Sequence, residues 1–370
     1  MFTTLDNGGV ESFLNNYYSE MDHKEIIFDF IVPNKKIGYL EEKMKRYGSN
    51  IFHIERLRSN PFEYYRSVSN IIQSGSYDII HCHGYKSFIG LLLGKKYNCK
   101  VRIIHSHMAY VKENIIQFIM RKVILILINL YSTDKFACGI DAACWLFGKK
   151  AYDKGQVSII NNAINIDDYD FNLTNRNKIR KEFNIKENEY LLGNVGRLTD
   201  QKNQGYIIDL ISLLPDNILS KLKFLFVGNG EDLKKLQEKI ESSNVSKYFI
   251  FAGLRTDVPQ ILSALDLFLL PSKYEGLPVV LVESQAAGLI SLASDTITKE
   301  INITGNICYM NLEKKELWIE AIKKNLLKSL QVNRLEESKK MYQSKYDIKF
   351  QSKKLFEKYS LLIKGERDEH

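Results

Sequence analysis

Short apolar runs alternate with longer amphipathic stretches along the chain, and the alternation begins twice. Strands that alternate with helices predict parallel sheets covered by helices. Most of the runs are apolar at nearly every position, which is typical of strands buried on both faces. The sequence therefore predicts an α/β protein with two doubly wound domains. The predicted strands span 26–32, 77–83, 101–107 and 135–138 in the first series, and 191–196, 222–228, 248–253, 267–271 and 290–293 in the second.

Helical stretches separate these strands, and the two series meet in a polar segment. The predicted helices span 61–74, 87–97, 113–131, 203–214, 230–243, 256–264, 278–288 and 313–330. Segment 161–178 is rich in Asn and Asp, so we place the boundary there, with an N-terminal domain at 1–165 and a C-terminal domain at 166–345. Ligands of doubly wound domains bind at the carboxyl ends of the strands. We therefore expect the ligand in a cleft between the two sheets.

The start of the chain is irregular for such a fold. A doubly wound domain normally opens with a full strand before its first glycine turn, and only "MFTTL" (1–5) precedes "DNGGVES" (6–12). We therefore predict that the first strand of the N-terminal domain is shortened or missing. Gly8 and Gly9 at this turn permit a phosphate or sugar to approach the backbone, or simply make a tight turn.

Composition excludes several classes of protein. An apolar content of 45% and a charged content of 26% are those of a globular protein. The five cysteines are scattered without a CxxC pair, which predicts neither a disulfide framework nor a zinc ribbon. The most apolar segment, 122–131, is shorter than the roughly 20 residues of a transmembrane helix, and the start lacks the features of a signal peptide. We expect a cytoplasmic protein with reduced cysteines.

Positive charge gathers in one segment. The formal net charge is +8, and segment 86–122 carries eight basic residues with Glu113 as its one acidic residue. Such a segment is either a solvated face or a contact for an anionic surface, such as lipid headgroups or a phosphorylated acceptor. The sequence contains no recognised nucleic-acid-binding module, so we expect no nucleic-acid partner.

Two cations follow the first strand of the second series. The segment "GNVGRLTDQKN" (193–203) predicts a strand, a tight turn and the start of a helix, with Arg197 and Lys202 beside the turn. Backbone N–H groups and the helix dipole add to the charge of two such cations, which suits a diphosphate; the alternative is a pair of solvated loop cations. In "FVGNGED" (226–232) two glycines allow close backbone approach, but the dinucleotide fingerprint needs a third glycine where Leu233 stands.

Two carboxylates lie in largely apolar surroundings. Glu275 precedes a helix that Pro278 is suited to begin, and Glu283 lies within that helix. A bare buried carboxylate is costly, so each needs a partner. A sugar diol supplies two O–H donors, whereas a salt bridge with Arg197 or a helix-dipole contact is the alternative. We expect both carboxylates to point toward the strand ends near the Arg197 turn.

Histidine and aspartate pairs raise the question of a metal. The segments "HCH" (81–83) and "HSH" (105–107) each end a strand, and residues i and i+2 of a strand share one face, so each pair could chelate. No carboxylate or cysteine cluster of matching spacing accompanies them, which favours a hydrogen bond from His107 to a substrate. A DxD pair in "DDYD" (167–170) could hold a cation on a diphosphate, but it lies in the polar linker. We expect no metal.

Several of these segments together resemble a known family. "YEGLPVVLVE" is similar to the E-x7-E motif of family 4 glycosyltransferases, and "GRLTDQKN" is similar to their phosphate-binding segment. "GGVES", "IIHSHM", "IINNAINIDDY", "VGNGED" and "FAGLRTDVP" follow the order of the family, most closely that of its branch for bacterial capsular polysaccharide and exopolysaccharide. The resemblance implies the GT-B fold, with two Rossmann-like domains, a cleft between them, and a last helix at 346–370 that crosses back to the N-terminal domain.

The resemblance also implies roles for individual residues. Arg197 and Lys202 would hold the donor diphosphate, and Glu283 would bind the ribose hydroxyls. Glu275 and His107 would be the catalytic residues, beside the transferred sugar. The implied donor-binding residues are Gly9, Arg197, Lys202, Leu254, Gly276, Leu277 and Glu283.

We therefore expect a retaining, metal-independent glycosyltransferase. Its donor would be a nucleotide sugar, with UDP as the expected nucleotide, and its acceptor a glycan carried on a polyprenyl diphosphate. Segment 86–122 would contact the anionic inner face of the cell membrane, where the protein would be peripheral. The alternatives are a sugar-nucleotide epimerase or phosphorylase of the same fold, or an inactive binding protein.

Overall fold

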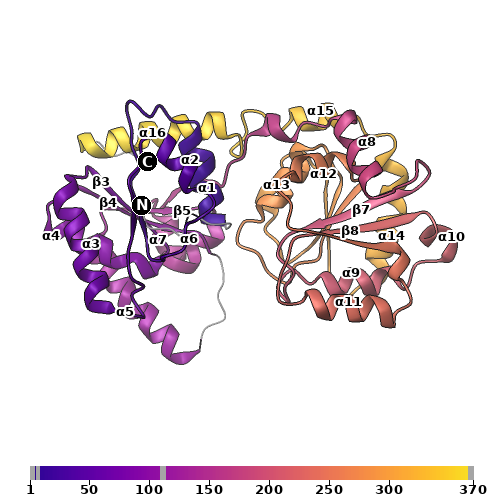
Figure 1. Cartoon of the computed structure of the whole chain (residues 1–370), viewed down its shortest axis with the longest axis horizontal. Coiled ribbons are helices and arrows are strands. Elements are labelled where there is room, and N and C mark those ends of the chain that lie inside the picture. Colours follow the sequence, from indigo (N-terminus) through magenta and orange to yellow (C-terminus); the bar gives the residue numbers. More distant parts are fainter. Residues whose placement is uncertain (1–4, 6–8, 109–113, 366–370) are drawn as a thin grey trace. The chain divides into compact units, whose positions relative to one another are not determined.

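The computed structural model describes residue 5 and residues 9–108 and 114–365 (Figure 1). The chain divides into two compact units. Unit 1 comprises Met1–Ala163 and Ile348–His370, and unit 2 comprises Ile164–Asp347. The last helix, α16 (Ile348–Lys364), therefore belongs to unit 1, where it contacts α1 (Gly9–Ser19).

The strands of unit 1 form two parallel groups. Strand β1 pairs with β2, and a second sheet has the order β3-β4-β5-β6. Helices α3, α4 and α5 cover one face, and α1 and α16 pack on the other (Figure 1). The strands are β1 (Phe30–Val32), β2 (Ile51–His53), β3 (Ile79–His83), β4 (Val101–Ser106), β5 (Asp134–Ala137) and β6 (Ser158–Ile159). The other helices are α2 (Glu41–Arg46), α3 (Pro61–Gly75), η1 (Tyr85–Ser87), α4 (Phe88–Lys96), α5 (Ile115–Tyr131), α6 (Ile140–Phe147) and α7 (Lys149–Asp153).

Unit 2 has one continuous parallel sheet of the order β12-β11-β10-β7-β8-β9. Helices α9 and α11 cover one face, and α12 and α13 cover the other (Figure 1). Its strands are β7 (Tyr190–Val195), β8 (Leu222–Val227), β9 (Phe249–Gly253), β10 (Leu267–Leu270), β11 (Ser291–Ser294) and β12 (Ile307–Met310). Its helices are η2 (Ile166–Tyr169), α8 (Leu173–Glu182), α9 (Gln204–Ile211), α10 (Asp216–Leu219), α11 (Leu233–Ser242), η3 (Ser246–Tyr248), α12 (Val258–Ala264), α13 (Val279–Ala286), η4 (Lys299–Ile301), α14 (Lys315–Ser329) and α15 (Arg334–Lys339).

Both sheets of unit 1 and the sheet of unit 2 are parallel, which confirms the predicted α/β class. Local signals explain several helix starts. Asn60 accepts a hydrogen bond from the backbone of Glu63, and Pro61 occupies the first turn of α3. At α5, Asn114 and Gln117 form a capping box.

One predicted strand was too long. The apolar run 26–32 forms a strand only at Phe30–Val32, because side chains bind the backbone around its first part. The Tyr18 hydroxyl accepts from the Phe28 backbone N–H, and the Asp29 carboxylate accepts from the Asn50 backbone N–H. The predicted short first strand in "MFTTL" covers residues 1–5. Residues 1–4 lie outside the described residues, whereas Leu5 is described and is fully buried.

No helix in the described part of the chain is long and apolar enough to span a membrane.

Candidate functional site

The turn that carries Arg197 is fixed by the two glycines of "FVGNGED". A Cβ atom on Gly228 would lie 2.1 Å from the Gly196 carbonyl oxygen, and one on Gly230 would lie 2.1 Å from the Leu198 carbonyl oxygen. Only glycine permits two backbones to pack so closely. The Leu198 N–H also donates to the Asn229 carbonyl oxygen. From the sequence, these glycines would let the backbone approach a ligand, whereas in the structure the closely packed group is the Arg197 turn of the same unit.

Lys202 and Glu275 form an ion pair at the carboxyl ends of β7 and β10. The Lys202 Nζ lies 2.7 Å from the Glu275 Oε1, and both side chains are largely buried. The Ser272 hydroxyl donates to the same carboxylate oxygen at 2.6 Å. The partner of Glu275 is therefore Lys202, whereas the salt bridge considered from the sequence was one with Arg197.

Hydrogen bonds to backbone carbonyl oxygens join the loop that carries Lys202 to the loop that carries Glu275. The Lys273 N–H donates to the Gln201 carbonyl oxygen, and the Gln201 amide donates to the Tyr274 carbonyl oxygen. The Asn203 amide donates to the Pro271 carbonyl oxygen at 3.1 Å. These bonds fix the position of Lys202 before any ligand binds.

Glu283 lies in α13 and meets a partner that the sequence did not predict. The Tyr169 hydroxyl, from η2, donates to the Glu283 Oε1 at 3.0 Å. Burial raises the pKa of the Glu283 carboxyl, while the Tyr169 hydrogen bond and the Lys202 charge oppose that rise. Burial also raises the pKa of Tyr169, with Glu283 as a further cause, so its hydroxyl stays protonated and donates. Lys202 thus acts electrostatically on both carboxylates of the E-x7-E segment.

The other predicted donor-site residues of unit 2 lie around this group or on its loops. Arg197 is exposed, and its carbonyl oxygen accepts a hydrogen bond from the Gln204 amide. Gly276 is partly exposed and Leu277 is 9% exposed, in the loop between Glu275 and α13. Leu254 is 73% exposed after β9. The structure therefore brings Lys202, Glu275 and Glu283 together and leaves the Arg197 guanidinium in solvent.

The DxD pair of the linker serves the fold. The Asp170 carboxylate accepts from the Ser338 hydroxyl at 2.5 Å and from the Tyr342 hydroxyl at 3.1 Å. Asp168 is exposed. Asp170 therefore ties η2 to the segment around α15.

The predicted residues of unit 1 lie near a cluster of imidazoles. Gly9 is exposed at the first position of α1, one turn before Phe13. The Phe13 ring lies 5.3 Å from the His107 ring and 5.0 Å from the His105 ring, centroid to centroid. Helix α1 therefore covers the ends of β3 and β4, where the four histidines of "HCH" and "HSH" share one face.

These imidazoles are neutral because they are buried. Burial lowers the pKa of His107 to about 3 and places those of His81, His83 and His105 well below the ordinary value. The His83 Nδ1 and His107 Nε2 atoms lie 2.8 Å apart, and the His81 Nδ1 lies 2.8 Å from the Tyr359 hydroxyl. The His107 Nδ1 is buried without a hydrogen-bond partner among the described residues. It can therefore exchange a hydrogen bond with a ligand, but it carries no charge.

Three histidines of this cluster lie close enough together to hold a metal ion. Ligand atoms of His81, His83 and His105 all lie within 4.8 Å of one another. Imidazole nitrogens suit zinc, copper or nickel. These possible metal ligands belong to unit 1, whereas Glu275 and Glu283, the carboxylates that could bind hydroxyl groups, belong to unit 2.

Unit 2 brings together the Lys202 cation, the carboxylates of Glu275 and Glu283, and the Tyr169 hydroxyl. A second cation, Arg197, is exposed five residues before Lys202. Such a set can bind a diphosphate through the cations and hydroxyl groups through the carboxylates. Unit 1 offers neutral hydrogen-bonding groups next to a helix N-terminus.

Comparisons with known proteins agree with this chemistry. Residues 175–346 match the family model described as glycosyl transferases group 1. The chain is 27% identical over 329 residues to EpsF of Bacillus subtilis, a glycosyltransferase-type protein, covering 86% of this chain and 84% of that one. It is 27% identical over 268 residues to the UDP-Gal:α-D-GlcNAc-diphosphoundecaprenol α-1,3-galactosyltransferase of Escherichia coli, covering 69% of this chain and 65% of that one.

Solved structures show the same fold. The crystal structure of HepE from Anabaena with UDP-glucose has a TM-score of 0.80 at 16% identity, covering 97% of this chain and 98% of that one. WaaG, a glycosyltransferase of lipopolysaccharide biosynthesis, has a TM-score of 0.70 at 17% identity and covers 97% of each chain. These proteins have the GT-B fold, which confirms the fold expected from the sequence.

Proposed function

We propose that the chain, a glycosyltransferase of bacterial polysaccharide synthesis whose residues 175–346 match the model of the glycosyl transferases group 1, uses a UDP-sugar as donor. Its acceptor would be a polyprenyl-diphosphate-linked glycan, and the reaction would retain the anomeric configuration. The UDP-glucose complex of HepE and the diphosphoundecaprenol acceptor in the name of the E. coli relative support the two substrates.

The observation that carries this proposal is the grouping of Lys202, Glu275, Glu283 and Tyr169. Glu283 is a partly buried carboxylate that accepts a hydrogen bond from Tyr169 and has a raised pKa. A ribose diol would supply further O–H donors to its oxygens, which would stabilise the charged form. Glu275 would accept from hydroxyls of the transferred sugar, and Lys202 would exchange part of its ion pair for the diphosphate.

The reaction then proceeds by breaking the bond between the anomeric carbon and the diphosphate oxygen. The acceptor hydroxyl oxygen attacks on the same face, and its proton passes to the leaving diphosphate oxygen. Arg197 and Lys202 stabilise the negative charge that develops on that leaving group. His107 would hydrogen-bond to the transferred sugar as a neutral imidazole, since a group of pKa about 3 is a poor base.

We further propose that no metal takes part. The two cations of the Arg197–Lys202 segment can supply the charge that a divalent ion supplies in other nucleotide-sugar sites. Treatment with EDTA should leave turnover unchanged, and a loss that Mg²⁺ or Mn²⁺ restores would contradict this assignment.

The exposed face of helix α5 is evidence for an acceptor that lies in a membrane. It exposes apolar side chains along much of its length, including Ile115, Ile119 and Ile126, which are 70%, 55% and 61% exposed. Lys122 lies among them and is also exposed. An apolar face with a lysine suits the interface of an anionic membrane. We propose that α5 and the exposed lysines of segment 86–122 hold unit 1 against the inner face of the cell membrane.

A pair of variants tests the donor site. Glu283→Gln should weaken UDP binding, because an amide is a poorer acceptor for a diol, whereas Glu275→Ala should reduce turnover and leave the UDP dissociation constant nearly intact. Calorimetry with UDP and a transfer assay with UDP-sugars separate the two effects, with Glu238→Gln on α11 as an exposed control. Equal losses in both measurements for Glu275→Ala would assign it a structural role. Release of a free epimer without acceptor would favour an epimerase.

A further inference from the structure

The segment "DDYD" holds its tyrosine on a fixed support. The Asp167 carboxylate accepts from the Tyr342 hydroxyl at 2.7 Å. The Asp170 carboxylate accepts from the same hydroxyl at 3.1 Å and from the Ser338 hydroxyl at 2.5 Å. Helix η2 also contacts α12 and α13, so it is bound on several sides. The two aspartates at the ends of the motif therefore fix the short helix that carries Tyr169.

The Tyr169 hydroxyl is a permanent donor to the Glu283 Oε1 atom, at 3.0 Å. Burial raises the pKa of Tyr169 well above its ordinary value, and the Glu283 and Asp168 carboxylates raise it further, so the phenol keeps its proton. A Glu carboxylate otherwise turns easily, because the last torsion of its side chain has broad wells. A donor on one oxygen therefore restricts the direction in which the other oxygen points.

Burial and the groups around Glu283 act on its carboxyl in opposite directions. Burial raises the pKa of this carboxyl, whereas the Tyr169 hydrogen bond and the Lys202 charge lower it. Lys202 is also the ion-pair partner of Glu275, so its charge is shared between two carboxylates. A hydrogen bond to the charged form of an acid favours that form. Without the Tyr169 hydroxyl, Glu283 should therefore take up a proton at a higher pH.

A carboxylate that binds a diol must be ionised and correctly turned. Its two oxygens offer about four acceptor positions, and the Tyr169 hydroxyl occupies one of those on Glu283. The other positions can receive both O–H groups of a ribose. Because Tyr169 meets both requirements before a ligand arrives, less conformational freedom is lost on binding.

We propose that Tyr169 is a positioning residue for the nucleotide: it turns the Glu283 carboxylate toward the ribose and stabilises the charged form of that carboxylate. The ligand class that this pair selects is a nucleoside diphosphate with both ribose hydroxyls. This role rests on the proposed function, because it takes Glu283 as the residue that binds the ribose. The segment "DDYD" then acts as a unit, in which the aspartates hold the support and the tyrosine acts on the donor site.

Calorimetry with UDP between pH 5 and 8.5 tests this role. Tyr169→Phe removes the hydroxyl and keeps the ring. The pH at which UDP affinity falls should rise by about one unit in this variant, because a hydrogen bond to a charged group changes an equilibrium about tenfold or more. Between the two midpoints the variant should bind UDP up to about tenfold more weakly. The analogue 2′,3′-dideoxy-UDP, which lacks both ribose hydroxyls, should bind both proteins with equal affinity.

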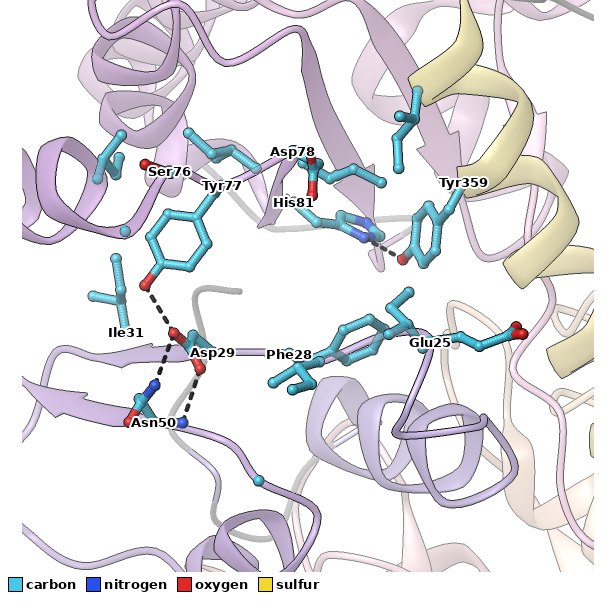
Figure 2. Close-up of a pocket in the computed structure, with 18 of the residues that line it drawn as sticks. Glu25, Phe28, Asp29, Ile31, Asn50, Ser76, Tyr77, Asp78, His81 and Tyr359 are labelled. Carbon is cyan, nitrogen blue, oxygen red and sulfur yellow. Dashed lines mark hydrogen bonds between the residues drawn. The ribbon is translucent and has the colours of Figure 1, made fainter.

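Two further variants show whether the effect passes through Glu283. In Glu283→Gln, the additional change Tyr169→Phe should cause no further loss of UDP affinity, since the carboxylate is absent. Unit 1 offers the matched control, because its Tyr77 hydroxyl donates to the Asp29 carboxylate at 2.9 Å, as Figure 2 shows. Tyr77→Phe removes the same kind of bond outside unit 2 and should leave the pH curve for UDP unchanged.

Three outcomes would contradict the role of Tyr169. An unchanged pH midpoint in Tyr169→Phe, while Glu283→Gln still weakens UDP binding, would reject Tyr169 and leave the proposed donor site standing. Equal losses for UDP and its dideoxy analogue would mean that the hydroxyl supports the fold of the site without acting through the ribose. Unchanged UDP binding by Glu283→Gln would reject both assignments, so this variant separates a failure of the donor site from a failure of Tyr169.

Discussion

The two units differ both in their sheets and in the charge of their functional groups. Unit 2 has six strands in one sheet, and its site is made of opposite charges held by the loops after β7 and β10. Unit 1 has a divided sheet, and its candidate groups are neutral imidazoles, one of which lacks a partner for its Nδ1 atom among the described residues. Unit 2 thus pairs its candidate groups with one another, whereas unit 1 leaves a buried hydrogen-bonding atom without a partner among the described residues. The following experiments test that contrast.

Loss of Lys202 should have the largest effect. Lys202→Met leaves the Glu275 and Glu283 carboxylates without their cation and removes the side chain that we propose as a ligand of the leaving diphosphate. We expect turnover to fall by about 10²–10³-fold, the range for loss of one preorganised electrostatic group. Steady-state kinetics with a UDP-sugar measure this fall in turnover. The matched control is Lys273→Met, which removes an exposed cation paired with Asp200 in the adjoining loop and should change turnover less than about threefold.

Acid should destabilise unit 1 before unit 2. All seven histidines lie outside residues 164–347. His81 and His105 are buried and have pKa values well below the ordinary one because of burial, so the unfolded chain binds protons that the folded chain does not. Stability is therefore lost as the pH falls below about 6.5, by about 2 kcal/mol for each such histidine at pH 5. His53 acts oppositely, since its bonds to Asn34 and Glu41 raise its pKa.

Hydrogen exchange at pH 7.5 and 5.0, corrected for intrinsic rates, measures this difference. Protection in β3 and β4 should decrease strongly, while protection in β7 and β8 should change little. A larger loss in unit 2 would show that its carboxylates, and not the buried histidines, control acid stability.

UDP affinity should depend on pH through Glu283. Burial raises the pKa of this carboxyl, and only its ionised form is the full acceptor for a diol. Affinity should therefore fall as the pH decreases through that raised pKa, by up to about tenfold, which is the effect of one charge-assisted hydrogen bond. Calorimetry between pH 5 and 8 provides the curve. In Glu283→Gln the curve should be flat over this range, and an unchanged slope would assign the titration to another group.

The sequence predicted those features that depend on local pattern. The strands of unit 2 were found to within about two residues, except β12, because apolar runs bounded by glycine and proline mark buried parallel strands. The short strands β2 and β6 were missed, since two or three residues carry too little periodicity. The apolar run before Phe30 was assigned to a strand because its side-chain hydrogen bonds cannot be inferred from its composition.

The parts of the site that were missed depend on contacts between distant segments. Tyr169 lies 114 positions from Glu283, and "NIDDY" carries no pattern that would indicate the hydrogen bond between them. Likewise, the choice of Lys202 over Arg197 as the partner of Glu275 is set by the hydrogen bonds that join two loops about 70 residues apart. Residue types were therefore predictable here, whereas the pairing of those residues required the fold.

The smallest expected effect concerns the exposed face of α5. Lys122 is exposed among apolar side chains, with its Nζ 5.4 Å from the Phe118 ring centroid. A lysine near an anionic surface contributes about 1 kcal/mol, so Lys122→Gln should weaken binding to phosphatidylglycerol vesicles about fivefold at low salt. Lys234→Gln on α11 of unit 2 is the control and should bind as the unaltered protein does. Arg102, another basic residue of segment 86–122, is not a suitable residue to replace in a test of vesicle binding. Its guanidinium donates to the Tyr131 and Cys99 carbonyl oxygens, so its loss would disturb the fold. Equal weakening by both lysine variants would mean that net charge, and not α5, attracts the protein to the vesicle.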